Sequence, residues 1–115
     1  AFGTPGSDQQ DQWQLILFLR LVHHRMNLQQ GVDEPLFHTG HFQESSYPRT
    51  ARPGHLMIEP SFGDKVITEL RARGHAIELT EPWTIGRLTA VMRDPDGLLH
   101  AAATLGLCGA YAIGR

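Results

Sequence analysis

The sequence predicts an α+β fold in which helices pack on an antiparallel β-sheet, formed by residues 1–115 as a single domain. Helical and extended patterns mix along the chain, and a short turn joins the last two extended segments as an antiparallel pair. A chain of 115 residues can bury one modest core. Apolar residues make up 41% of the sequence and charged residues 19%, a balance that is typical of a globular rather than a disordered protein.

The first and longest predicted helix covers residues 8–25. Acidic residues lie in its first turn and basic residues in its last, so both ends complement the helix dipole. Apolar side chains cover most of its circumference, namely Trp13, Leu15, Ile16, Leu17, Phe18, Leu19, Leu21 and Val22. A helix that is apolar nearly all round requires burial on several sides. We therefore expect it to pack against something absent from this chain or against a second copy.

The remaining elements follow from helical periodicity, strand-like runs and Gly or Pro punctuation. They are a helix at 27–33, an extended segment at 36–42, a polar loop at 43–53, a strand at 55–59, a helix at 62–73, a strand at 76–79 and a hairpin of 87–93 with 98–104. Asn27 is expected to cap the second helix, Pro35 to end it and Gly74 to end the third. The hairpin turn is predicted at Asp94-Pro95-Asp96-Gly97.

The net charge and the apolar runs argue against two classes of partner. The formal net charge is −2 and the basic residues are scattered, so we expect no nucleic-acid partner and no membrane partner. The apolar run at residues 15–22 is too short to span a bilayer and contains Arg20. The single cysteine, Cys108, excludes an internal disulfide and is expected to be a small buried apolar side chain.

A turn before the first helix is the main candidate for a functional site. Pro5 fixes one backbone dihedral, Gly6 permits conformations that other residues avoid, and Ser7 can cap the helix. The first amides of a helix have no internal partner, so such a turn can bind an anion or a developing oxyanion. By spacing alone an ordinary capped helix start is the simpler interpretation, because capping requires nothing more.

Two other groups of residues favour structural roles. His38 and His41 lack the spacing of a helical zinc pair and have no cysteine partner, so we expect hydrogen-bonded or solvated histidines and no metal. Asp8 and Asp11 are explained by the helix dipole rather than by catalysis. No cofactor is expected.

The stretch Gly3-Thr4-Pro5-Gly6-Ser7-Asp8-Gln9-Gln10 resembles the Ser/Thr-Pro-Gly-Gly segment of the gamma-glutamyltransferase (gamma-glutamyltranspeptidase) family. The resemblance continues, in the family's order and spacing, through Met26-Asn27-Leu28, Asp33-Glu34-Pro35-Leu36-Phe37-His38, Glu69-Leu70-Arg71-Ala72-Arg73-Gly74-His75, Arg93-Asp94-Pro95-Asp96-Gly97 and Gly109-Ala110-Tyr111-Ala112-Ile113-Gly114-Arg115. It implies the αββα sandwich of the N-terminal-nucleophile hydrolases. It also implies that this chain is the C-terminal part of a small subunit.

The resemblance further implies a parent enzyme that transfers or hydrolyses gamma-glutamyl groups of glutathione-type substrates through a threonine acyl-enzyme. The nucleophilic threonine would lie upstream of Ala1, so this chain alone would be inactive, and Thr4 would not replace it. Gly6 and Ser7 would donate their backbone N–H groups to the oxyanion. Ser7 departs from the family's glycine, and a left-handed backbone there would cost a serine roughly 1 kcal/mol or more.

Two alternatives remain open at this point. The parent could be an amidohydrolase similar to the cephalosporin acylases, which share the fold. The isolated chain could instead be a non-catalytic α+β module that forms a homo-oligomer through its first helix. The implied partners are a gamma-glutamyl small molecule and the rest of the parent chain or its large subunit. The resemblance is compatible with the bacterial cytoplasm and with export to the periplasm or the medium.

Overall fold

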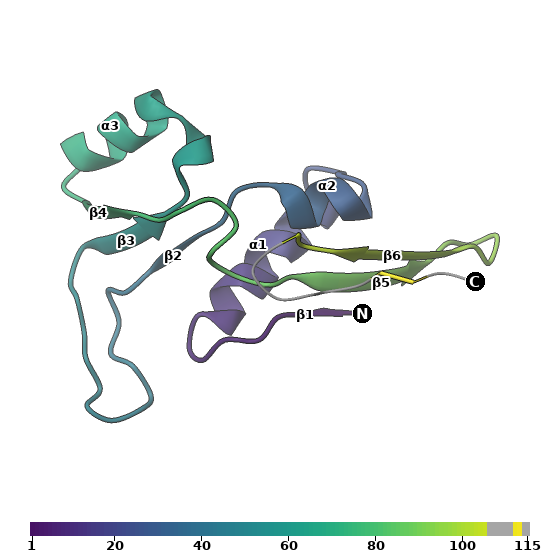
Figure 1. The fold of residues 1–115 in the computed structure, drawn as a ribbon, viewed down its shortest axis with the longest axis horizontal. Coiled ribbons are helices and arrows are strands. Elements are labelled where there is room, and N and C mark those ends of the chain that lie inside the picture. Colours follow the sequence, from purple (N-terminus) through teal and green to yellow (C-terminus); the bar gives the residue numbers. More distant parts are fainter. Residues whose placement is uncertain (106–111, 114–115) are drawn as a thin grey trace. The chain divides into compact units, whose positions relative to one another are not determined.

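Figure 1 shows the computed structural model, which describes residues 1–105 and 112–113. The expectation for Cys108 therefore lies outside the described residues. The chain separates into two compact units. Unit 1 consists of Ala1–Glu34 and Gly86–Arg115, and unit 2 of Pro35–Ile85.

Unit 1 contains a three-stranded antiparallel sheet and two helices. Its elements are β1 (Phe2–Gly3), α1 (Gln10–Val22), α2 (Leu28–Asp33), β5 (Thr89–Arg93) and β6 (Leu99–Ala103). The strand order is β1-β5-β6, with Ala90 opposite both Phe2 and Ala102. The predicted hairpin is confirmed, because β5 and β6 are joined by a turn in which the Gly97 N–H donates to the Asp94 carbonyl at 2.9 Å. Gly97 has φ 93°, a conformation that favours glycine.

The core of unit 1 lies where α1 and α2 pack on the sheet (Figure 1). Its fully or nearly fully buried side chains are Leu17, Val32, Leu88, Ala90 and Ala102. Arg20 is also buried, and its guanidinium donates to the carbonyls of Gly31 and Glu34 at 3.1 Å each. These carbonyls lie at the C-terminal end of α2, where helical carbonyls lack an internal donor, so Arg20 ties α1 to that end.

The helix ends of unit 1 correct one expectation and confirm another. α1 begins at Gln10 instead of residue 8, and its N-cap residue Gln9 makes no side-chain capping bond. The prediction that the Ser7 side chain caps α1 is therefore wrong. Ser7 contributes its backbone carbonyl instead, which accepts from the Gln10 N–H at 3.1 Å. Asn27 does cap α2, in a capping box with Gln30.

Unit 2 contains a mixed sheet and two short helical elements. Its elements are β2 (Phe37–Thr39), β3 (His55–Ile58), the 3-10 helix η1 (Pro60–Phe62), α3 (Asp64–Ala72) and β4 (Ala76–Leu79). The order is β2-β3-β4, with β2 antiparallel and β4 parallel to β3. The parallel pair departs from the antiparallel arrangement expected for the sheet, because η1 and α3 carry the chain back to the start of β3. Gly63, at φ 85°, divides the predicted helix of residues 62–73 into η1 and α3.

A buried carboxylate organises unit 2. Glu59 is 5% exposed, and its Oε2 accepts from the Leu36 N–H while its Oε1 accepts from the Trp83 N–H, both at 2.9 Å. Trp83 has φ 65°, which a bulky residue rarely adopts. Glu59 thus binds Leu36 near one end of the unit and Trp83 near the other. Each of its carboxylate oxygens accepts a hydrogen bond in this way.

Within the described part of the chain, no helix has the length and apolar character needed to cross a bilayer.

Candidate functional site

The turn before α1 is held by β1 and by the hydroxyl group of Thr4. Ala1 and Val91 exchange two backbone hydrogen bonds, at 2.9 and 2.8 Å, which continue the pairing of β1 with β5. The Thr4 Oγ1 accepts from the Arg87 N–H and donates to the Pro5 carbonyl, both at 3.0 Å. The hydroxyl of Thr4 therefore has a structural role in fixing the start of the turn.

Gly6 is required by both its backbone and its surroundings. Its φ of 132° is a conformation that other residues rarely adopt. A Cβ atom at this position would lie 2.6 Å from Cζ3 of Trp13, and the Trp13 side chain is buried in unit 1. The indole therefore packs directly against the backbone of the turn.

Ser7 fits the turn without the strain that its replacement of a glycine led us to expect. Among the described residues other than glycine, only Arg25, Arg49 and Trp83 have a positive φ. A serine can therefore occupy position 7 without the cost of a left-handed backbone.

Two adjacent backbone N–H groups are available at this turn. Neither the Gly6 N–H nor the Ser7 N–H donates a hydrogen bond to another described residue. Gly6 is half-buried and Ser7 is exposed. Both groups precede α1, whose dipole adds positive potential at this end. The arrangement can bind a carboxylate, a phosphate or an oxyanion.

The histidines considered from the sequence lie in unit 2, whereas Gly6 and Ser7 lie in unit 1. The His41 Nδ1 accepts from the Gly54 N–H at 3.0 Å. His38 is buried, and burial is the main cause that lowers its pKa, with the charges of His55 and Arg52 adding to the effect. Among residues 1–105, 112 and 113, no group of three or more His, Cys, Asp or Glu side chains could hold a metal ion.

A polar cluster on the sheet of unit 2 was missed by the sequence analysis. The Glu78 Oε2 lies 2.7 Å from the His55 Nε2 and 3.2 Å from an Arg52 guanidinium nitrogen. The hydrogen bond from His55 is the main cause that lowers the pKa of Glu78. The partners are 23 and 26 residues apart. The strand–helix–strand order of residues 55–79 indicates a parallel pair, but it does not show which side chains the register of β3 and β4 brings together.

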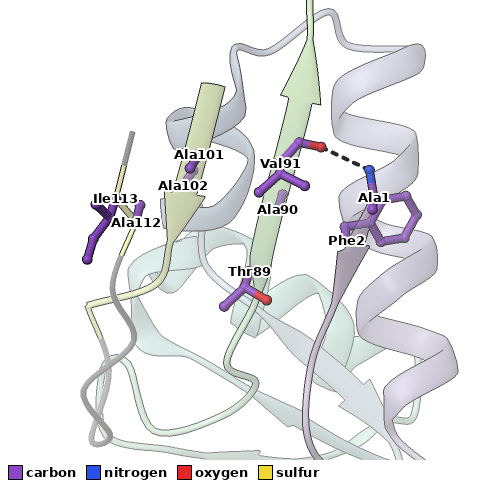
Figure 2. Close-up of a pocket in the computed structure, with 9 residues that line it drawn as sticks. All are labelled: Ala1, Phe2, Thr89, Ala90, Val91, Ala101, Ala102, Ala112 and Ile113. Carbon is purple, nitrogen blue, oxygen red and sulfur yellow. Dashed lines mark hydrogen bonds between the residues drawn. The ribbon is translucent and has the colours of Figure 1, made fainter. Parts of the chain in front are cut away.

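A shallow pocket of about 310 Å³ lies on the sheet of unit 1 (Figure 2). Its lining is nearly all apolar and consists of Ala1, Phe2, Thr89, Ala90, Val91, Ala101, Ala102, Ala112 and Ile113. Its one polar side chain is that of Thr89, whose hydroxyl donates to the Gly3 carbonyl at 3.4 Å. The pocket is suited to apolar packing.

Comparison with known sequences places most of the chain within one protein family. The profile of the family described as Gamma-glutamyltranspeptidase matches residues 1–109. The glutathione hydrolase-like YwrD proenzyme of Bacillus subtilis (strain 168) is 29% identical over 104 residues, covering 89% of this chain and 19% of that protein. The oxamate amidohydrolase proenzyme of Klebsiella pneumoniae subsp. pneumoniae is 30% identical over the same length and coverage. The chain thus spans about a fifth of the length of these curated relatives.

Solved structures agree with the sequence comparison. LmbA2991HD is 48% identical, with a TM-score of 0.91 over 100% of this chain and 21% of its own. Gamma-glutamyltranspeptidase from Pseudomonas nitroreducens has a TM-score of 0.74 at 18% identity, over 99% of this chain and 54% of its own. Cephalosporin acylase from Bacillus halodurans also has a TM-score of 0.74, at 23% identity, over 90% of this chain and 18% of its own. The fold is therefore the α+β fold of the N-terminal-nucleophile hydrolases, as expected.

Proposed function

This chain belongs to the gamma-glutamyltranspeptidase family, and from that premise we propose that it is the C-terminal portion of an enzyme acting on gamma-glutamyl compounds. The parent transfers or hydrolyses the gamma-glutamyl group of glutathione-type substrates. Its other partners are the rest of the parent chain or its large subunit. This segment supplies scaffold and the turn that stabilises the oxyanion.

The observation that carries this proposal is the pair of available N–H groups at Gly6 and Ser7. A threonine hydroxyl elsewhere in the parent attacks the gamma-glutamyl carbonyl carbon, and the two N–H groups stabilise the negative oxygen that forms. The C–N bond then breaks, the amine leaves with a proton, and an ester to threonine remains. Water or a second amine attacks the ester and releases the threonine.

A second candidate is an amidohydrolase similar to the cephalosporin acylases. The observation in its favour is the likeness of this chain to the acylase from Bacillus halodurans and to the oxamate amidohydrolase. The same oxyanion turn serves any amide, because backbone donors contact the carbonyl oxygen and not the acyl group.

The backbone donor at position 7 can be tested in the parent enzyme. Ser7→Pro removes the N–H, and we expect kcat to fall about 100- to 1000-fold with a smaller change in KM. Ser7→Gly and Ser7→Ala keep the N–H and should retain most of the activity. If the proline variant is folded by circular dichroism and is as active as the wild-type enzyme, the Ser7 N–H has no role in the mechanism.

The identity of the substrate needs a separate measurement. We expect the parent to acquire the mass of a gamma-glutamyl group when mixed with gamma-glutamyl p-nitroanilide, and to release p-nitroaniline. If the parent cleaves a glutaryl amide but not gamma-glutamyl p-nitroanilide, the result favours the acylase candidate. The 115-residue chain by itself should release no p-nitroaniline. If it does turn over substrate, and its intact mass excludes another subunit, the nucleophile lies within these residues.

A further inference from the structure

The peptide group between Pro5 and Gly6 carries one of the two available N–H groups, and its neighbours in the chain allow it to turn over. Its rotation changes only ψ of Pro5 and φ of Gly6. Proline fixes φ but leaves ψ open, and glycine adopts positive and negative φ about equally well. The contact with Trp13 requires a glycine at position 6. The residue that lets the turn fit against the indole therefore leaves the direction of its own N–H group unspecified by the local backbone.

The hydroxyl group of Thr4 specifies this direction. The Thr4 Oγ1 donates at 3.0 Å to the Pro5 carbonyl, which is the oxygen of the same peptide group. The Pro5–Gly6 bond is trans, and in a trans peptide the C=O and N–H bonds point in opposite directions. A hydrogen bond that holds the carbonyl therefore fixes the direction of the Gly6 N–H. The Ser7 N–H belongs to the next peptide group, so the Thr4 hydroxyl does not hold it.

The hydroxyl of Thr4 is in turn held by the backbone that leads into β5. The Arg87 N–H donates to the Thr4 Oγ1 at 3.0 Å. Arg87 directly precedes Leu88, which is fully buried and whose carbonyl accepts from the Thr104 N–H at 2.9 Å. The hydroxyl therefore has a fixed point in unit 1 on one side and the turn on the other. Because its single proton is donated to the Pro5 carbonyl, the same hydroxyl cannot also donate to an oxyanion.

We propose that Thr4 is a positioning residue of the oxyanion turn, which directs the Gly6 N–H toward the developing oxyanion by holding the Pro5 carbonyl. This inference rests on the proposed function, in which the N–H groups of Gly6 and Ser7 stabilise that oxygen. Thr4 acts through the peptide group and not through contact with the substrate. Without its hydroxyl the Pro5–Gly6 peptide samples both orientations, and in one of them the N–H points away from the substrate carbonyl.

Steady-state kinetics of the parent enzyme test the inference, with gamma-glutamyl p-nitroanilide or, if the parent cleaves that instead, a glutaryl amide. Thr4→Val nearly keeps the shape of the side chain and removes both hydrogen bonds. We expect kcat to fall on the order of 10- to 100-fold, with KM changed less than about threefold. Thr4→Ser keeps the hydroxyl and should retain most of kcat. A serine variant as impaired as the valine variant would contradict the inference.

Thr89→Val is the matched control. The Thr89 hydroxyl also donates to a backbone carbonyl of β1, that of Gly3 at 3.4 Å, but this carbonyl belongs to a peptide group outside the turn. The control should leave kcat unchanged. If Thr4 only stabilises the fold, Thr4→Val lowers the melting temperature and leaves kcat unchanged at temperatures well below it. That result would overturn the inference.

A crystal structure of the parent with Thr4→Val gives a readout that does not depend on activity. We expect the Pro5–Gly6 peptide to be rotated relative to the wild-type enzyme or to be present in both orientations. An unchanged peptide would overturn the inference.

The outcomes also separate this inference from the proposed function. If Ser7→Pro lowers kcat and Thr4→Val does not, the oxyanion turn is supported and the role of Thr4 is refuted. If Ser7→Pro has no effect while the Pro5–Gly6 peptide rotates in Thr4→Val, the hydroxyl holds the turn but the turn is not the oxyanion site. The proposed function is then wrong, and so is the catalytic part of this inference.

Discussion

The indole of Trp13 packs against Gly6 so closely that a Cβ atom on Gly6 would lie 2.6 Å from the ring. This relationship links the first buried residue of α1 to the turn that carries the two available N–H groups. The shape of the turn is therefore set from within the core of unit 1 and not by the loop alone.

Replacement of Gly6 by alanine should destabilise the chain by about 2 to 6 kcal/mol. The positive φ costs about 1 to 3 kcal/mol, and the contact with a buried ring adds a similar amount. Urea unfolding followed by tryptophan fluorescence measures the change. Gly3→Ala is the matched control, because nothing lies within 4 Å of its Cβ position and its φ is not positive. Equal effects of the two substitutions would contradict the role of Trp13.

Replacement of Glu59 by glutamine should cost about 1 to 3 kcal/mol. The amide NH₂ of glutamine would face one of the two backbone N–H groups that the carboxylate accepts, and that buried donor would lose its acceptor. Chemical unfolding measures the loss. Glu44→Gln, in the exposed loop, should have no measurable effect.

Acid should weaken the fold through His38. Burial lowers its pKa below the ordinary value of 6.5, so the unfolded chain takes up protons at a higher pH than the native chain does. Stability should therefore fall as the pH drops below about 6.5 towards the lower folded pKa. His55, Arg52 and Glu78 face this group, and the Glu78 charge opposes the effect without reversing it.

A pH series of urea unfolding curves measures this dependence. His38→Asn should flatten the slope between about pH 5 and pH 7, whereas His24→Asn, at an exposed position, should leave it unchanged. An unchanged slope in His38→Asn would show that other groups cause the acid sensitivity.

The pKa of Glu78 should depend on His55 more than on Arg52. The His55 hydrogen bond is the largest cause of its lowered pKa, so His55→Asn should raise that pKa more than Arg52→Gln does. NMR titration of the Glu78 carboxyl group measures both shifts. The contribution of Glu78 to stability is present above the unfolded value of 4.5 and is lost as the pH falls through the lower folded pKa. A larger shift in the arginine variant would contradict this order.

Sequence patterns predicted the elements whose signals are local. The Asp94–Gly97 turn fixes the hairpin of β5 and β6, and Asn27 with Gln30 fixes the start of α2, because these signals lie within four residues of the structure they specify. The turn at Gly6 was found for the same reason. The prediction of Ser7 as the N-cap was wrong, because the N-cap is set by the residue at which α1 begins. The helix begins at Gln10, so Gln9 is the N-cap residue.

The missed features depend on residues that are far apart in the sequence. Glu59 reaches Leu36 and Trp83, which are 23 and 24 residues away, and His55 reaches Glu78 across the parallel pair of β3 and β4. In the sequence, Glu59 cannot be distinguished from a surface glutamate, because the two N–H groups that donate to it lie far away along the chain. The contact of Trp13 with Gly6 has the same character, since the sequence does not show which side of α1 is buried.

The order in which the two units can form during synthesis follows from their connectivity. Unit 2 is continuous, so its three strands and α3 are complete once Ile85 has left the ribosome. Unit 1 pairs Phe2 with Ala90, and this pairing cannot close until β5 has been made. Domains generally fold as they emerge, and contacts that are distant in sequence form late. While unit 2 folds, the apolar residues of α1 in a nascent chain therefore still lack the two strands β5 and β6, which complete their core.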